Sequence, residues 1–458
     1  MTRQMLARFA GLAPALLIAL APTLRAQQST AHEVPTQPIT LADAARIASR
    51  QTAAVEAARF RSGEAGARVR QRKAELLPSV TANAIESGHT LNSATFGFDF
   101  PAAPGEKPLL DPAGQIIGPV NTIDVRGQLR VPIYDAAARA RVTAALADVD
   151  VSNAGITTAS QVAAVNAASA YVRAERADAQ LLARAADSTL AADLLRIAQE
   201  QLRAGVGVAL DVTRAQSQLA TVRAQLIAAR TDRDRSRLDL IRAMNLPIDT
   251  HIVLADSLAT TAPETTLDEQ TATANALRNR PDLRAAEEQI RAAERQVQAT
   301  RAERLPTVNA FGDEGVIAKN SNGNYLNTYT WGVQLSVPVF EGFRREGRAE
   351  ELELVRREAE MRRRDLQEQA RVEVRQALLE LNSAREQVDA AREQLRLTEQ
   401  ELSQARDRFR AGVAGNADVI TASLSLNGAR TQLNDAFASW QLAKVGLARA
   451  QGTAADLR

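Results

Sequence analysis

The side chains that most often carry out chemistry in proteins are sparse in this sequence. It has no cysteine and three histidines, which excludes disulfides and thiolate sites. His32, His89 and His251 fall in segments of linker or loop character, and no two can share a helix turn, so nothing supports a metal site built on paired histidines. No carboxylate pair, Ser–His set or phosphate-binding glycine loop stands out. We therefore expect no enzyme activity, no cofactor and no metal.

The chemically suggestive residues that do recur are a short turn motif and the aspartate that follows it. The motif, Arg-Ala-Gly-Val, contains a glycine. Because glycine tolerates positive φ, the motif fits a reversal between two antiparallel helices. Asp211 follows the first copy and Asp418 the second, each at the start of the next helix. The two copies are Arg203-Ala204-Gly205-Val206 and Arg410-Ala411-Gly412-Val413.

These turns belong to an internal duplication of the chain. Leu77-Pro78-Ser79-Val80 returns as Leu305-Pro306-Thr307-Val308, and the segment 128–134 returns as 334–340, in the same order. Each half is expected to run helix, strand, loop, strand, very long helix, tight turn, long helix. Proline cannot donate to a strand ladder or sit inside a helix. Pro78 and Pro306 therefore mark changes from helix to strand, and Pro132 and Pro338 mark changes from strand to helix.

Two of the expected strands alternate between apolar and polar residues. The apolar or small residues of the first strand are Ile123, Val125, Gly127, Leu129, Val131 and Ile133, and those of the second are Tyr329, Trp331, Val333, Leu335, Val337 and Val339. A barrel in lipid needs this pattern, with its apolar side outward and a wet lumen inside. A half-buried strand of a soluble sheet has the same period, so the alternation by itself leaves both interpretations open.

The expected long helices carry a seven-residue apolar repeat. On the helix after 343 the large residues are Val374, Leu381, Val388, Leu395, Leu402 and Phe409, and on the next they are Val419, Leu426, Leu433, Trp440 and Leu447. Small residues, mostly alanines, follow three positions later and permit close packing. Such a repeat makes a narrow left-handed seam between two helices. It predicts a shell of paired helices; an extended soluble coiled coil is the alternative.

The remaining composition favours export and gives no reason to expect nucleic acid. The 56 basic and 54 acidic residues are interleaved along the expected helices. Arg3 and Arg8 precede an apolar stretch from Leu12 to Leu20, and Ala26 is a suitable cleavage residue. The stretch is too short to span a bilayer, which favours a signal peptide over a membrane anchor.

The resulting layout has two repeats joined by a linker. Residues 1–26 form the signal peptide, 27–250 the first repeat, 251–267 the linker, 268–452 the second repeat and 453–458 a C-terminal tail. The strand hairpins are expected at about 79–133 and 306–340, and the long helices at 135–204, 208–245, 343–411 and 416–451.

From about residue 40 to 452 this arrangement resembles the TolC-like outer-membrane efflux proteins. The resemblance rests on the duplication, on Val337-Pro338-Val339-Phe340-Glu341-Gly342 and on the two turn motifs. It implies a mainly α protein in which a homotrimer gives four strands per subunit to a twelve-stranded transmembrane β-barrel, continued by an α-barrel of coiled-coil helices. It places the protein in the outer membrane, extending into the periplasm. It implies outer-membrane lipid, a periplasmic adaptor and an inner-membrane transporter as partners.

The resemblance also assigns roles to the repeated turns. Both turns are expected at the periplasmic tips, in contact with the adaptor. Asp418 matches an acidic residue at the periplasmic entrance, and Asp211 is its counterpart in the first repeat; the alternative is that both are ordinary first-turn acids. Thr421, Ala414 and Phe409 depart from the acid, arginine and tyrosine of the best-known member, so its closing network is not expected here.

The function implied is a passive duct that exports small molecules in a tripartite efflux system. The exit duct of a type I protein secretion system uses the same fold and differs in its partners. A soluble periplasmic coiled-coil scaffold is the alternative from another class.

Overall fold

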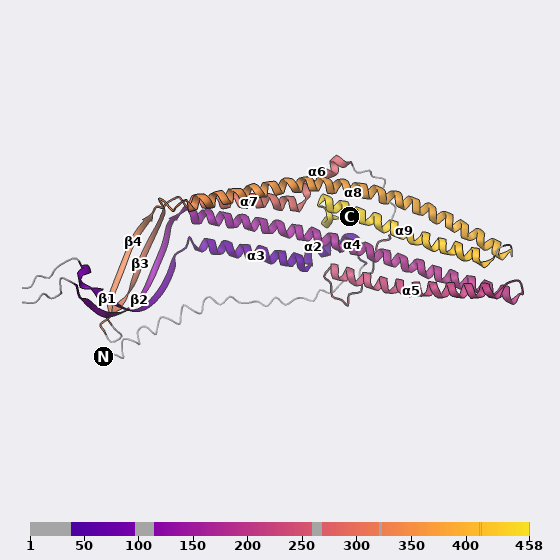
Figure 1. The fold of residues 1–458 in the computed structure, drawn as a ribbon, viewed down its shortest axis with the longest axis horizontal. Coiled ribbons are helices and arrows are strands. Elements are labelled where there is room, and N and C mark those ends of the chain that lie inside the picture. The colour runs from indigo at the N-terminus through magenta and orange to yellow at the C-terminus, as the bar shows by residue number, and fades with distance from the viewer. Residues whose placement is uncertain are drawn as a thin grey trace, which may run out of the picture. The chain divides into compact units, whose positions relative to one another are not determined.

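The computed structural model describes residues 38–96, 114–258, 268–319, 323–411, 413 and 415–457, which belong to the unit Pro38–Arg458 (Figure 1). The predicted signal peptide, including Ala26, lies outside the described residues, as do His32, Gly412 and Ala414.

Helices and strands follow the same order in both halves of the chain, with two shorter helices before two strands and two long helices after them. In the first half they are α2 (Leu41–Gln51), α3 (Ala53–Ala74), β1 (Ser79–Asn92), β2 (Ile116–Asp135), α4 (Ala136–Arg203) and α5 (Ala209–Ala243). In the second they are α6 (Glu269–Asn279), α7 (Pro281–Ala302), β3 (Thr307–Ala318), β4 (Leu326–Ser336), α8 (Arg344–Arg410) and α9 (Asn416–Gln451). Two short 3-10 helices, Ser93–Phe96 and Ala454–Asp456, complete the described elements.

The strands form an antiparallel sheet in the order β1-β2-β3-β4 (Figure 1). Leu129 of β2 stands opposite Val80 of β1 and Gly312 of β3, and Gly312 stands opposite Trp331 of β4. Opposed residues share a face of the sheet, so the apolar positions of all four strands gather on one side. The period-two pattern of the sequence thus becomes a sheet with one mainly apolar and one mainly polar face.

The helices continue the order of the strands to which they connect. α3 packs on α4, α4 on α7, and α7 on α8. The helices α3, α4, α7 and α8 therefore lie in the same order as the strands β1, β2, β3 and β4 that they adjoin in sequence. Farther from the sheet, α4 pairs with α5 and α8 with α9, and α4 and α9 join the two pairs. Within the described residues, α3, α5 and β1 therefore form one open edge of the subunit, and α8 and β4 form the other.

The seven-residue seam lies inside these helix pairs. Val374, Val388, Leu402 and Phe409 of α8 are buried, and so are the alanines three residues after the first two. On α9 the buried seam includes Val419, Leu426, Trp440 and Leu447. Since the large residues alternate with alanine, the core is spread along the helices as several small clusters. In the described part of the chain, no helix combines the length and the apolar character needed to cross a membrane.

Three local expectations differ from the structure. Pro132 lies within β2, at a register shift before Tyr134, because an irregular position tolerates a residue without an N–H. β4 ends at Ser336, so Val337 and Val339 lie beyond the strand, where Pro338 cannot donate to a ladder. The first part of the expected linker is not a free connection: residues 251–258 pack on the helices, with Ile252 and Leu258 buried.

Candidate functional site

The repeated turns lie at the ends of the long helices, away from the strands. α4 ends at Arg203, Ala204 follows in a helical conformation, and Gly205 has a φ of +76°. The side chain of Val206 is 79% exposed, and Val413 of the second turn is 72% exposed. Arg410 ends α8 and Ala411 caps it. Each tip thus presents apolar side chains to solvent: Val206 with the nearby Val208 and Leu210 at the first, and Val413 at the second.

The two aspartates that follow the turns differ in their surroundings. Both lie in the first turn of a helix, where a carboxylate favours the positive end of the helix dipole. The side chain of Asp211 is mostly covered and lies 3.8 Å from Arg214. The side chain of Asp418 is exposed, and no described residue forms an ion pair with its carboxylate. Of the two, Asp418 has the carboxylate that is free to meet ions in solution.

Hydrogen bonds join the two tips to each other. Nε2 of Gln201 on α4 donates to the carbonyl oxygen of Phe409 on α8 at 3.3 Å. Nδ2 of Asn416 on α9 donates to the carbonyl oxygen of Asp211 on α5 at 3.0 Å. The side chain of Asn416 is fully buried, so this contact is shielded from water. The two helix pairs therefore end as one connected tip.

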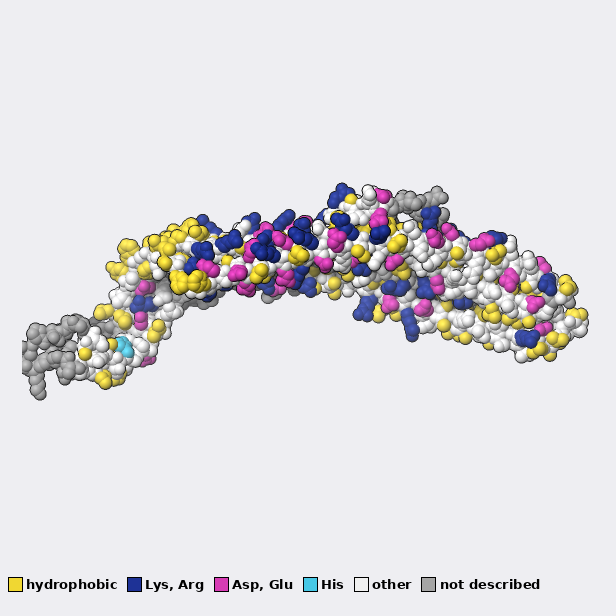
Figure 2. Space-filling view, turned by 45° about the horizontal axis from the view of Figure 1, so that its top comes forward, with side chains coloured by type: hydrophobic (Ala, Val, Ile, Leu, Met, Phe, Trp, Pro, Cys, Tyr) yellow, Lys and Arg dark blue, Asp and Glu magenta, His cyan; other side chains and the backbone are white. Residues whose placement is uncertain are grey.

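The sheet offers two chemically different surfaces. Its apolar face carries large exposed side chains, among them Leu129, Trp331, Val333 and Leu335. Figure 2 shows hydrophobic side chains gathered over this region of the molecule. On the polar face, Arg126 of β2 lies 2.7 Å from Asp124 and 2.8 Å from Asp313 of β3. A soluble sheet would cover its apolar face with helices, whereas here none of the described helices packs on it.

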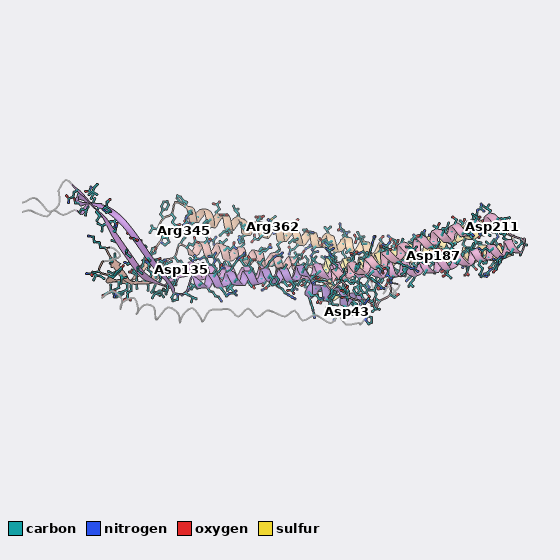
Figure 3. All side chains as sticks on the ribbon, turned by 90° about the horizontal axis from the view of Figure 1, so that it is seen from below. Asp43, Asp135, Asp187, Asp211, Arg345 and Arg362 are labelled. Atoms are coloured by element: carbon teal, nitrogen blue, oxygen red, sulfur yellow. The ribbon has the colours of Figure 1, made fainter. Side chains whose placement is uncertain are left out.

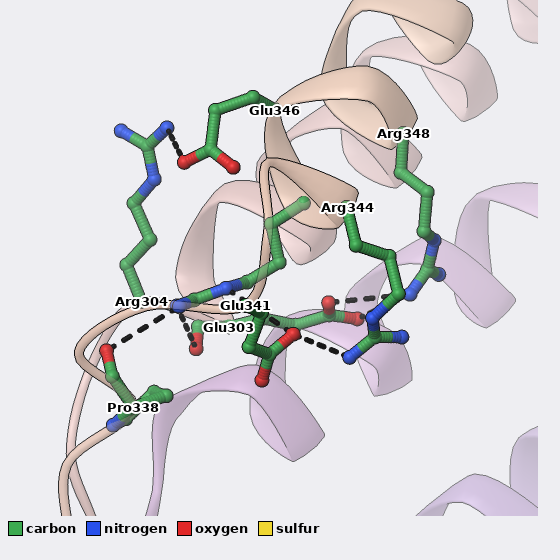
Figure 4. Close-up of polar contacts among 8 residues, drawn as sticks. Glu303, Arg304, Pro338, Glu341, Arg344, Glu346 and Arg348 are labelled. Carbon is green, nitrogen blue, oxygen red and sulfur yellow. Dashed lines mark hydrogen bonds and ion pairs between the residues drawn. The ribbon is translucent and has the colours of Figure 1, made fainter.

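The passage from β4 to α8 is held by one buried arginine. The guanidinium of Arg345 donates to the carbonyl oxygens of Glu303 and Pro338 at 3.3 and 3.4 Å. It also lies 3.5 Å from the carboxylate of Glu341. Around it run the ion pairs Arg304–Glu346, Arg344–Glu341 and Arg348–Glu303 (Figure 4). The network fastens the end of α7 to the start of α8, and so fixes the helices beneath the strands.

The corresponding passage in the first repeat uses different residues. Asp135 caps α4 by accepting a hydrogen bond from the amide of Ala138 at 2.7 Å. Arg141 lies 2.9 Å from Glu75, which is the counterpart of Glu303 after α3. Both repeats thus use a glutamate at the end of the helix before the hairpin, paired with an arginine of the helix after it. Pro78 and Pro306 directly precede β1 and β3 at these passages.

A buried polar cluster joins α4 to α9 between the tips and the middle of the helices. The side chain of Asp187, which is labelled in Figure 3, is fully buried and lies 3.0 Å from Arg430 and 3.3 Å from Arg184. Burial raises the pKa of Asp187, although the ion pairs with Arg430 and Arg184 oppose this. In the orientation that satisfies its hydrogen bonds, the side-chain amide nitrogen of Asn427 donates to both carboxylate oxygens of Asp187. The carboxylate is thus fully paired within the interface.

Sequence reasoning missed this cluster and the arginine beneath the sheet. Asp187 is one heptad before Leu194 and three residues before Leu190, which are both buried. A charged residue at a seam position was the signal that could have revealed it. No comparable signal exists for Arg345, because two of its three partners are backbone carbonyl oxygens, which every residue has. Among the described residues no group of metal-binding side chains is present.

A sheet with one bare apolar face, continued by long paired helices, defines the class of outer-membrane channel subunits. The chain belongs to the outer membrane efflux protein family, whose model matches residues 45–246 and 272–453. It is accordingly an outer-membrane protein that extends into the periplasm. The predicted family, fold class and location are confirmed. No curated protein matched the chain in sequence.

Several solved structures share this fold. The CmeC outer membrane channel of Campylobacter jejuni aligns with 17% identity over 90% of this chain and 86% of that chain, with a TM-score of 0.71. The outer membrane protein VceC of Vibrio cholerae aligns with 19% identity over 90% of this chain and 96% of that chain, with a TM-score of 0.67. The open state of the Neisseria gonorrhoeae MtrE outer membrane channel aligns with 20% identity over 90% of this chain and 88% of that chain, with a TM-score of 0.66. At such identities the likeness concerns the fold alone.

Proposed function

We propose that this chain is one subunit of a homotrimeric duct that exports small molecules across the periplasm and the outer membrane within a tripartite efflux system. The observation that carries the proposal is the sheet, which has an apolar face, a polar face and two unpaired edges. A strand edge in lipid has no water to satisfy its backbone groups, so it must close on another strand. Copies of the chain supply that strand when β1 of one subunit pairs with β4 of the next.

The helices support the same head-to-tail closure. On α8 a second set of exposed apolar side chains falls within about 20° of one line along the helix at 3.6 residues per turn. Its members are Leu354, Met361, Val372, Leu379 and Leu397. They lie on the side away from the seam with α9. The opposite edge also carries exposed apolar residues, among them Phe60 of α3 and Ile227 and Leu238 of α5. Edges of this kind fit a heterologous contact that closes into a ring.

Reconstitution tests the duct directly. The purified protein is expected to run as a heat-sensitive trimer from outer-membrane fractions and to conduct ions in planar lipid bilayers. A protein recovered as a soluble monomer without conductance would contradict the proposal. Val333→Arg, which places a charge on the apolar face of the sheet, gives a matched non-inserting sample for the same measurement.

The tips are the proposed contact with a periplasmic adaptor, which would link the duct to an inner-membrane transporter. Support comes from the exposed Val206 and Val413 and from the likeness of Arg203–Val206 to Arg410–Val413. Replacing Val206 and Val413 by aspartate should abolish drug resistance in cells while leaving trimers in the outer membrane. Glu200→Gln, an exposed change on the same helix, should preserve resistance. Full resistance in the double aspartate variant would remove the tips from the adaptor contact.

Asp418 is proposed to line the periplasmic entrance, because its carboxylate is exposed and unpaired among the described residues. A ring of such carboxylates raises the local concentration of cations. Asp418→Asn should therefore lower the preference for cations in single-channel recordings. Asp211→Asn should change selectivity less, because Asp211 is mostly covered and faces Arg214. Equal selectivity in Asp418→Asn and the unchanged protein would leave Asp418 as a first-turn acid only.

A further inference from the structure

A buried carboxyl group without a partner lies halfway along α4. The side chain of Glu175 is 5% exposed, and its Oε1 is buried without a hydrogen bond among the described residues. No described residue forms an ion pair with it, in contrast to Asp187 on the same helix. A carboxylate buried without a partner is strongly unfavourable, whereas the neutral acid is tolerated. The position therefore calls for a role that a protonated glutamate can fill.

Glu175 adjoins a joint where two extended segments are held against α4. Residues 38–41 and 251–258 pair in parallel through Ile39 and Leu254. Their backbones exchange hydrogen bonds from Ile39 to Val253 at 2.9 Å and from Ala255 to Ile39 at 3.0 Å. The amide of Leu41 donates to Asp256 at 2.7 Å. We call this paired structure the joint.

Tyr171 fastens the joint to α4, one helix turn before Glu175. Its hydroxyl donates to the carbonyl oxygen of Ile39 at 2.8 Å and accepts from the amide of Asp256 at 3.2 Å. Residues four apart on a helix share a face, so Glu175 lies on the same side of α4 as this contact. Tyr171 itself is fully buried.

The charges around Glu175 are mainly negative or already paired. Burial, followed by the negative charges of Asp256 and Asp178, raises the pKa of Glu175 to about 7. Arg237 of α5 forms an ion pair with Asp178 at 2.8 Å. On α9, Lys444 lies over the Trp440 ring at 4.8 Å and feels the charge of Asp256.

Two further ion pairs involve α4 and the helix α2 that packs on it. Arg176 pairs with Asp435 of α9, and Asp43 pairs with Arg46 on α2. Within the described residues none of these cations forms an ion pair with Glu175, and no positive charge offsets the rise in its pKa.

We propose that Glu175 is a proton-dependent latch, whose neutral form lets the joint close on α4 and whose ionisation places a third negative charge beside Asp256 and Asp178 and loosens the joint. The folded protein binds this proton more tightly than the unfolded chain does, because burial penalises the charged form. The stability of the joint consequently falls as pH rises from the ordinary carboxyl range through about 7. Residues 251–258 lead from α5 towards the second repeat, so ionisation leaves the two repeats joined by the pairing of β2 with β3 and by the packing of α4 on α7 and α9.

Hydrogen exchange of the assembled protein in detergent tests the latch. After correction for intrinsic rates, peptides covering 38–41 and 251–258 should exchange about tenfold faster at roughly pH 8 than at pH 6, since the neutral fraction falls by about that factor across the interval. In Glu175→Gln, which stays neutral, these peptides should remain protected at both pH values. The exposed Glu200→Gln should behave as the unchanged protein.

A second variant shifts the transition without removing the latch. Asp178→Asn takes away one negative charge and frees Arg237, so it should move the pH at which the exchange of these peptides changes. Since removing a like charge and freeing a cation both favour ionisation of Glu175, the expected shift is to lower pH. Infrared difference spectra should show a protonated carboxyl band near pH 6 that Glu175→Gln lacks. Identical pH dependence in Glu175→Gln and the unchanged protein, or no such band, would overturn the proposal.

Discussion

At the scale of single residues, charged side chains in this protein are stabilising where they are paired across an interface. Asp187 makes its contacts with Arg430 on another helix, and its carboxylate has no access to water. Arg345 likewise bonds to carbonyl oxygens of separate segments. Removing one member of such a set leaves the others buried and unpaired, which costs more than the contact itself contributes.

Asp187→Ala is therefore expected to destabilise the α4–α9 interface by about 3–5 kcal/mol. Denaturant-induced unfolding of the purified protein, followed by circular dichroism, measures the change. The matched control is Asp435→Ala, which breaks the exposed pair with Arg176 between the same two helices. An exposed pair contributes at most about 1 kcal/mol. Equal effects of the two substitutions would show that burial does not govern the Asp187 contact.

At the scale of elements, the strands and turns depend on backbone geometry as much as on side chains. Neighbouring residues of a strand point to opposite faces, so Val333 and Gln334 lie in chemically different surroundings although they adjoin in sequence. The turn after α4 needs a positive φ at Gly205, which a residue with a Cβ adopts only with strain. Each feature gives a substitution whose outcome depends on geometry alone.

Val333→Arg should prevent stable insertion, because an arginine on a lipid-facing strand position costs about 2–4 kcal/mol near the bilayer centre. Gln334→Arg adds the same group to the polar face and should be tolerated. The amount of heat-sensitive trimer in outer-membrane fractions is measured for both variants and compared. Loss of trimers in both variants, or in neither, would contradict the assignment of the faces.

Gly205→Ala should destabilise the tip by about 1–2 kcal/mol through backbone strain. Gly66→Ala in α3 should instead stabilise by about 0.5–1 kcal/mol, because alanine is the better helix former. A Cβ at either position meets no atom within 4 Å, so packing is matched between the two. Thermal unfolding, together with proteolysis at the tip, distinguishes them. A stabilising Gly205→Ala would mean that the turn relaxes to a negative φ.

At the scale of the whole molecule, the described subunit is an incomplete structure. Its two edges, one formed by α3, α5 and β1 and the other by α8 and β4, each expose apolar side chains and have no neighbour among the described residues. The proposed ring of copies would cover both edges at once. The stability of the protein should accordingly depend on association, and its folding on insertion into the membrane.

Leu379→Glu is expected to weaken association, because it places a charge in the second apolar line of α8. Glu380→Lys changes an adjacent exposed residue outside that line and should leave association intact. Native mass spectrometry of the detergent-solubilised protein measures the fraction of trimer in each case. A full complement of trimer in Leu379→Glu would show that this line of α8 faces solvent in the assembly.

Much of the architecture follows from periodicities in the sequence. The seven-residue repeat to which Val374, Val388 and Leu402 belong predicts the buried seam of α8, because a seam depends on local spacing alone. The alternation in β2 and β4 predicts a two-faced sheet for the same reason, and the duplication predicts that both halves share one order of elements. The roles of the tips, Asp211 and Asp418 stay predictions, since they concern contacts with ions and partners.

The tertiary structure decided what local spacing cannot encode. It joined residues 38–41 to 251–258, and it brought Asp256, which is distant in the sequence, near Glu175. It also ended β4 at Ser336 and brought Arg345 to the carbonyl oxygen of Glu303. Burial and electrostatic surroundings are sums over neighbours from distant segments, so they exist only once the chain has folded. Periodicity, by contrast, is already present in the unfolded chain, and for that reason the sequence alone determined the long helices and the faces of the strands.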